Sequence, residues 1–240
     1  MLFVHGLESH ALWFNSMAAE FGIRGMSSYA WNRAQNHPSS DRLISLRSDL
    51  DRIASFLQKK HSKVILVGNS WGGLLVLDQM TSSHTPWYKY IAIAPALFSY
   101  KAFSWKKLLR AGARRLSNNG GSYIPVEIDT SKFSSDPNIQ EYIRNDPLRR
   151  QTVSIDLLLS TFLLRWAVRR RLSSLSVEKK SRCLIMAAEK DKIIATKTLL
   201  KFCKSSQIEF VHFANCEHTL IMEAPEALVS CIMDERTSLK

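Results

Sequence analysis

The sequence predicts a single α/β domain, in which a mostly parallel sheet is flanked by helices and one segment is inserted. Three observations predict it. Short apolar runs of strand type alternate with helical patterns, as in parallel sheets covered by helices. This alternation is lost over residues 97–180 and returns afterwards. A chain of 240 residues with 45% hydrophobic content can bury one large core. We therefore expect residues 1–96 and 181–240 to form the core and 97–180 to form an insertion.

The core segments supply the alternating strands and helices. Lys63 to Val67 (KVILV) is the clearest strand, because nearly all of it is apolar or β-branched, as in a parallel strand buried on both faces. Gly6 ends the first strand where the backbone must turn sharply, and Ser39 to Asp41 predicts a helix N-cap. The predicted strands are 1–5, 26–31, 63–67, 90–94, 183–188 and 209–213, and the predicted helices are 11–21, 43–57, 71–80, 196–203 and one from about Pro225.

The insertion holds most of the positive charge. The chain has a formal net charge of +12, and residues 97–180 contribute +9 of it, with 16 Lys and Arg against 7 Asp and Glu. The segment contains a loop around Ser117 to Gly121 and a helical pattern around Ile155 to Ala167. Because the sequence has no recognition motif for nucleic acid and the charge is confined to this insertion, we expect no nucleic-acid partner.

Cysteine usage and hydropathy indicate a soluble, cytoplasmic protein. The four cysteines lack the CxxC spacing of redox or metal motifs, so we expect free and mostly buried thiols. No stretch approaches the roughly 18 consecutive apolar residues of a membrane-spanning helix. The N-terminus also lacks a basic stretch followed by an apolar run and a cleavage site. The cysteines are Cys183, Cys203, Cys216 and Cys231.

A G-x-S-x-G pattern follows the clearest strand directly. Gly68-Asn69-Ser70-Trp71-Gly72 lies between that strand and a predicted helix. In this setting a serine stands on a strained turn, and the flanking positions must be glycine because a Cβ would collide with neighbouring backbone. Ser70 is therefore the candidate nucleophile, with Gly68 and Gly72 completing its turn. The alternative to a catalytic role is a tight glycine turn in which the serine has no function.

A serine hydroxyl needs a base and a group that orients the base. His218 follows the strand 209–213 and Asp191 follows the strand 183–188, so both lie at the strand ends where parallel sheets place their sites. Glu189 competes with Asp191 for the orienting role. We expect Glu217 and Glu223 to face solvent. The other histidines lack a strand-end position with a suitable partner, and His212 is expected to point into a helix layer.

Acyl-transfer chemistry also needs two backbone N–H groups aimed at the carbonyl oxygen. Trp71 follows the nucleophile, and Leu7 lies in the loop after the first strand. These two residues are the candidate oxyanion hole. We expect the imidazole of His5 only to support this loop.

The motifs resemble the monoacylglycerol lipase and lysophospholipase branch of the α/β-hydrolases. The resemblance covers almost the whole chain and rests on LFVHGLESH, YAWNR, VGNSWGG, DPNIQEYIRNDPL, AAEKDKII and FANCEHTLIMEAPE. It implies the α/β-hydrolase fold, a helical cap at residues 97–180, and hydrolysis of a small-molecule ester or lipid through an acyl-enzyme. This chemistry needs no metal and no organic cofactor.

The sequence departs from the resemblance at three places. After Arg33 it has Ala34-Gln35-Asn36-His37, where relatives often carry a glycine-rich stretch. It begins at the strand that carries His5 and Gly6, whereas similar proteins have an antiparallel strand pair before it. We therefore expect that pair to be missing and Met26 to Trp31 to form a sheet edge. The elbow also carries Trp71 where methionine is common, which predicts a narrower acyl pocket.

Two functional readings compete. In the first, an ester hydrolase uses its basic cap to approach anionic membranes or phosphate-bearing lipids. In the second, a weak or inactive relative acts as a membrane- or partner-binding module through the same cap. Charges that merely solvate the cap are the bland alternative to membrane contact. The basic residues are Lys106, Lys107, Arg110, Arg114, Arg115 and those within Arg165 to Arg171.

Overall fold

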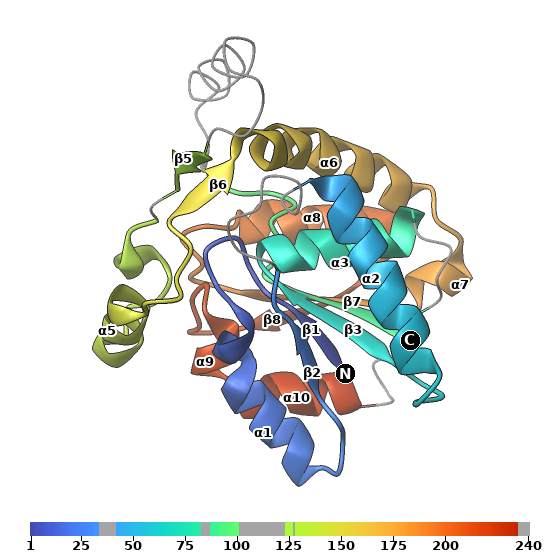
Figure 1. Ribbon diagram of the computed structural model, residues 1–240. Coiled ribbons are helices and arrows are strands. Elements are labelled where there is room, and N and C mark those ends of the chain that lie inside the picture. The colour runs from blue at the N-terminus through green and yellow to red at the C-terminus, as the bar shows by residue number, and fades with distance from the viewer. Residues whose placement is uncertain (34–41, 83–86, 101–122, 127, 235–240) are drawn as a thin grey trace.

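The computed structural model describes residues 1–33, 42–82, 87–100, 123–126 and 128–234. Their central sheet is parallel throughout, in the order β2-β1-β3-β4-β7-β8 (Figure 1). Strand β1 lies between β2 and β3, so the chain adds its next strand on one side of β1 and later strands on the other. Open parallel sheets bind their ligands at the carboxyl ends of the strands at such a switch point. The strands are β1 (Leu2–Val4), β2 (Tyr29–Trp31), β3 (Ile65–Asn69), β4 (Lys89–Ile93), β7 (Cys183–Ala188) and β8 (Glu209–Phe213).

Helices cover both faces of the sheet. Figure 1 shows α1 (Asn15–Ile23) and α10 (Pro225–Met233) side by side on one face. The other face carries α2 (Leu43–Gln58), α3 (Trp71–Ser82) and α8 (Thr196–Ser206), with α3 packed on β3 and β4. Both faces of β3 are therefore buried, which explains its continuous apolar sequence. A 3-10 helix, η1 (Ala11–Phe14), precedes α1, and the short α9 (Leu220–Glu223) precedes α10.

The described residues between β4 and β7 add a further layer of elements outside the helices of the sheet. Helix α6 (Ile155–Ser173) packs across α3 and α8 on the side away from the sheet (Figure 1). The buried carboxylate of Asp78 on α3 binds Arg47 of α2 at 2.6 Å and Arg171 of α6 at 2.8 Å, which ties this layer to the core. Its other elements are the antiparallel pair β5 (Tyr123–Pro125) and β6 (Thr152–Ser154), η2 (Thr130–Lys132), α5 (Pro137–Asn145) and α7 (Val177–Lys180).

The predicted order of strands and helices is confirmed, and β2 lies at the edge of the described sheet. The cysteines are free, with Cys183 and Cys203 buried and the other two half-buried. The N-cap at Ser39 to Asp41, the loop at Ser117 to Gly121 and the basic residues from Lys106 to Arg115 lie outside the described residues. Among the helices that are described, none is both long and apolar enough to cross a membrane.

Three predictions about single residues are wrong. Glu223 is half-buried rather than solvent-facing, because its carboxylate accepts the backbone N–H of Glu217 and the hydroxyl of Thr219. His212 is exposed rather than turned into a helix layer, because β8 is an edge strand and the outer side of its end is open. Glu217 is buried rather than solvent-facing, at 5% relative exposure, because its carboxylate binds groups from other loops.

Candidate active site

Ser70 occupies a strained turn between β3 and α3. Its φ angle is +54°, in the left-handed region that costs a non-glycine residue about 1–3 kcal/mol. A Cβ on Gly68 would meet the carbonyl of Gly72, and a Cβ on Gly72 would meet the carbonyls of Val4 and His5. Both glycines are therefore sterically required. The turn lifts the Ser70 side chain above the carboxyl ends of the strands.

The structure brings Ser70, His218 and Asp191 together. His218 Nε2 lies 3.1 Å from Ser70 Oγ, and His218 Nδ1 lies 2.8 Å from Asp191 Oδ2. The other oxygen of Asp191 accepts the backbone N–H groups of Ile193 and Ile194, each at 2.7 Å. Because a carboxylate only accepts, Nδ1 of the imidazole must donate, which leaves Nε2 free to accept the serine proton.

The competing acid lies elsewhere. Glu189 is exposed, whereas the Asp191 side chain has no exposed surface. The backbone N–H of Glu189 pairs with the carbonyl of Phe213, so this residue still continues the strand alignment. Two residues later the chain has turned across the strand end, and the side chain of Asp191 points inward. The number of residues after the end of β7 therefore decides which of the two carboxylates reaches His218.

Contacts with the insertion hold the loop that carries His218. The buried carboxylate of Glu217 accepts the N–H of Ser135 and pairs with Lys192 at 2.5 Å. Burial raises the pKa of Glu217, but the donors Lys192 and Ser135 outweigh it and hold that pKa below its usual value. The ring of Phe133 packs edge-on against His218, with centroids 5.7 Å apart. His218 is thus held by contacts with Phe133 and, through Glu217, with Ser135, as well as by Asp191.

The loop after β1 is oriented by two side chains. The carbonyl of Gly6 accepts from His5 Nδ1 and from Arg33, both at 2.8 Å, and His5 Nε2 accepts the backbone N–H of Arg33. Burial and the nearby Arg33 charge lower the pKa of His5 well below its usual value, which agrees with this neutral tautomer. Because the peptide is trans, the N–H of Leu7 points away from the held carbonyl.

Trp71 offers the second backbone donor. As the first residue of α3 it has an N–H without an acceptor inside the helix, at the positive end of the helix dipole. Its indole lies under the guanidinium of Arg33, 4.6 Å from the ring centroid, and donates to Thr161 Oγ1 at 2.9 Å. Sequence reasoning missed Arg33. Its signals were the YAWNR motif of the resemblance and its place just after β2, at the sheet end where Gly6 also lies.

Two cavities meet at Ser70. The first extends under α6, is mostly apolar, and is lined by Leu7, Ser70, Trp71, Ala96, Ser99, Val126, Ile128, Val153, Leu158, Thr161, Arg165, Ile193 and Ile194. The second reaches His218 and is more polar, with Gly6, Leu7, Glu8, Ser9, Trp13, Asn69, Ser70, Ile128, Phe133 and His218 in its wall. A bound ester would have one part in each. Within the described residues, no group of three His, Cys, Asp or Glu side chains is placed to hold a metal ion.

Comparison with known families identifies the chain. Residues 1–225 match the family model described as Serine aminopeptidase, S33. The chain belongs to this family of α/β-hydrolases. A comparison of this α/β-hydrolase sequence with curated proteins gave no match.

Solved structures share the α/β-hydrolase fold across nearly the whole chain. The monoacylglycerol lipase of Paleococcus ferrophilus is similar with a TM-score of 0.82 and 17% identity, covering 96% of this chain and 91% of that one. A soluble variant of the Saccharomyces cerevisiae monoglyceride lipase, in complex with a substrate analog, gives 0.79 and 14%, covering 100% and 86%. The thioesterase domain from the curacin biosynthetic pathway gives 0.63 and 16%, covering 96% and 89%. At these identities the likeness establishes the fold alone.

Proposed function

We propose that this α/β-hydrolase cleaves carboxylic esters of lipid type through an acyl-enzyme. The proposal rests on one observation. Ser70, on its strained turn, contacts His218, and His218 contacts Asp191. His218 takes the hydroxyl proton as Ser70 Oγ attacks the ester carbonyl, and Asp191 stabilises the imidazolium that forms. The N–H groups of Leu7 and Trp71 bind the oxygen that becomes negative.

The two cavities divide the substrate between them. When the tetrahedral intermediate collapses, His218 gives its proton to the departing alkoxide, so the alcohol leaves beside His218 in the second cavity. The acyl group stays on Ser70 and occupies the first cavity, whose described lining lacks His218. Water then enters from the alcohol side, loses a proton to His218, and releases the carboxylic acid.

The first cavity favours an acyl chain over a peptide. An aminopeptidase must bind the substrate's ammonium group, for which a carboxylate is the natural partner, yet the described lining of this cavity contains none. The nearest acidic group of the second cavity, Glu8, is already paired with Arg149 at 2.6 Å. Structural likeness to lipases that act on monoacylglycerols supports a monoacylglycerol or lysophospholipid substrate. Residues 97–180 would then be the cap over the acyl chain.

Labelling with a fluorophosphonate probe tests the proposal. Wild type should be labelled and Ser70→Ala should not, and p-nitrophenyl esters of graded chain length should be hydrolysed by wild type alone. A folded wild type that resists labelling and leaves every ester intact would refute the proposed chemistry. That result would favour the binding-module alternative.

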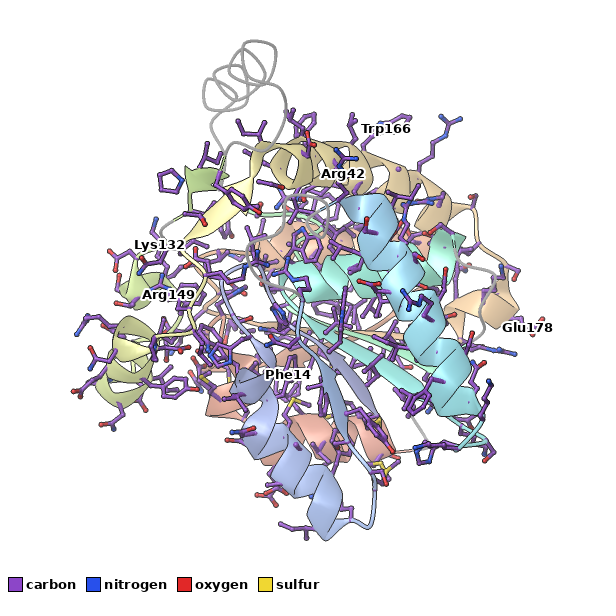
Figure 2. The ribbon with its side chains drawn as sticks, in the orientation of Figure 1. Phe14, Arg42, Lys132, Arg149, Trp166 and Glu178 are labelled. Carbon is purple, nitrogen blue, oxygen red and sulfur yellow. The ribbon has the colours of Figure 1, made fainter. Side chains whose placement is uncertain are left out.

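We also propose that the outer face of α6 contacts anionic membranes. Phe162, Leu163 and Trp166 are 59%, 67% and 59% exposed there, and the guanidinium of Arg170 lies over the Trp166 ring. Figure 2 shows Trp166 on the side of α6 away from the core. Exposed apolar and cationic side chains on one helix face are typical of interfacial helices. Sedimentation with vesicles tests this, and equal binding to neutral and anionic vesicles at low salt would contradict it.

A further inference from the structure

Arg165 places a cation in the first cavity, whose described lining is otherwise uncharged and mostly apolar. It lies one helical turn after Thr161 on α6, so the two side chains share a face, and Thr161 is bonded to the Trp71 indole. Arg165 also lines the cavity that contains Ser70 and Trp71. This arginine therefore belongs to the substrate cavity, unlike Arg170 on the same helix, which is exposed and stacks on Trp166.

The described residues give this guanidinium no anionic partner. The Nε atom of Arg165 is buried and makes no hydrogen bond. By contrast, Arg171 shares the carboxylate of Asp78 with Arg47, and Arg149 binds the carboxylate of Glu8. Burial and the neighbouring Arg169 lower the pKa of Arg165 to about 10, which leaves it charged at neutral pH. A cation that is partly buried without a partner loses hydration, and an anion arriving with the substrate offsets that loss.

We propose that the preferred substrate has an acyl chain that carries a carboxylate, and that Arg165 binds this carboxylate. The inference rests on the proposed ester hydrolysis and names its substrate class. A planar guanidinium matches a carboxylate with two parallel hydrogen bonds. The acyl side is assigned because Arg165 lines the first cavity, whereas the alcohol departs through the second. Between Ser70 and the guanidinium, the lining is apolar enough to hold methylene groups.

Two matched substrates test the inference. Mono-p-nitrophenyl adipate carries the free carboxylate, and p-nitrophenyl methyl adipate has the same length with that charge masked. For wild type, kcat/KM should be about 10- to 100-fold higher for the charged ester, the value of a charge-assisted contact. Arg165→Met should reduce this ratio to about one. Arg170→Met removes an exposed charge from the same helix and should keep the wild-type ratio.

Each contrary outcome is distinguishable. A wild type that is labelled by fluorophosphonate and hydrolyses the masked ester, but shows no preference for the charged one, overturns the inference and leaves the proposed function standing. Absence of both labelling and hydrolysis refutes the proposed function instead. An equal fall in the ratio for Arg165→Met and Arg170→Met would assign the preference to the general field of the basic insertion and overturn a specific contact.

One acidic residue calls for its own control. Glu127 lies between Val126 and Ile128, which both line the cavity, and is itself outside the described residues. Glu127→Gln should leave the preference for the charged ester unchanged. An increase in that preference would mean that Glu127 already neutralises Arg165, and would overturn the inference.

Discussion

Two histidine–aspartate pairs among the described residues have nearly the same hydrogen-bond distance and burial. His218 Nδ1 lies 2.8 Å from Asp191, with side chains 2% and 0% exposed, and His10 Nε2 lies 2.7 Å from Asp146, with side chains 3% and 5% exposed. They differ in the other ring nitrogen. His218 presents Nε2 to Ser70 Oγ, whereas Nδ1 of His10 accepts the backbone N–H of Leu12.

The difference shows that a pair acquires chemistry from its third partner. The ring of His10 caps the 3-10 helix η1, and Asp146 also accepts the indole N–H of Trp13 at 2.7 Å. Both ring nitrogens of His10 are thus committed to structure, and the pair joins the loop after β1 to the insertion. His218 instead retains one nitrogen for a hydroxyl on a strained turn. The first pair should carry stability and the second activity.

Exchanging either histidine for alanine should give the largest contrast. His218→Ala is expected to lower kcat/KM for p-nitrophenyl esters by at least about 10⁴-fold, because the serine loses its base. His10→Ala should keep kcat/KM within a few-fold of wild type and lower the melting temperature instead. Ester hydrolysis and thermal unfolding, measured on both variants, check this. Loss of activity in a well-folded His10→Ala variant would contradict the separation.

The carboxylates should separate in the same direction. Asp191→Asn is expected to reduce kcat by about 10⁴-fold with little change in fold, since an amide favours the wrong imidazole tautomer. Asp146→Asn should retain kcat and lose about 1–3 kcal/mol of unfolding free energy, because a charged acceptor of buried donors is replaced. Urea denaturation and steady-state kinetics measure the two effects. Equal kinetic losses would mean that the second pair also supports the site.

Acid should remove the structural pair's contribution. Burial raises the pKa of Asp146, but the donors Trp13 and His10 outweigh it, so its folded pKa lies below the usual value. A depressed folded pKa gives stability that is present above the unfolded pKa, about 4, and is lost as the pH falls through the folded pKa. The stability difference between wild type and Asp146→Asn should therefore be constant from neutral pH to about 5 and shrink below about 4. A difference that stays flat down to pH 2 would contradict the role assigned to Asp146.

What the sequence predicts in this molecule is local. The turn at Ser70 is marked by its glycines between a strand and a helix. A Cβ on Gly68 would meet Gly72 four residues later, whereas a Cβ on Gly72 would meet the end of the neighbouring strand β1. Asp191 and His218 follow recognisable strands, and the carboxyl ends of parallel strands gather at one side of a sheet. Those three side chains could be named before any coordinates, and the structure places them in contact.

What the sequence does not predict depends on distant partners. His10 contacts Asp146, which lies 136 residues away in the sequence, and no periodic pattern predicts such a contact. Arg33 orients the Gly6 carbonyl from another strand, and Glu217 is buried by loops of the insertion. In the sequence, Arg165 cannot be distinguished from the other basic residues of the segment 97–180. The packing of α6 over α3 turns Arg165 toward the cavity, whereas Arg170 on the same helix is exposed.

The smallest expected effect concerns the two contacts of His10, the helix cap at Leu12 and the bond to Asp146. A substitution that keeps only the first should measure each contribution to stability. His10→Asn keeps a side-chain acceptor suited to the Leu12 N–H but gives up the bond to Asp146, so it should cost about 1 kcal/mol, less than His10→Ala. Denaturation of both variants, and of each combined with Asp146→Asn, measures the two contributions. A coupling of about 1 kcal/mol between positions 10 and 146 would show that the pair stabilises directly. Zero coupling would leave the cap as the whole contribution of His10, and the resemblance between the two pairs would then be one of geometry only.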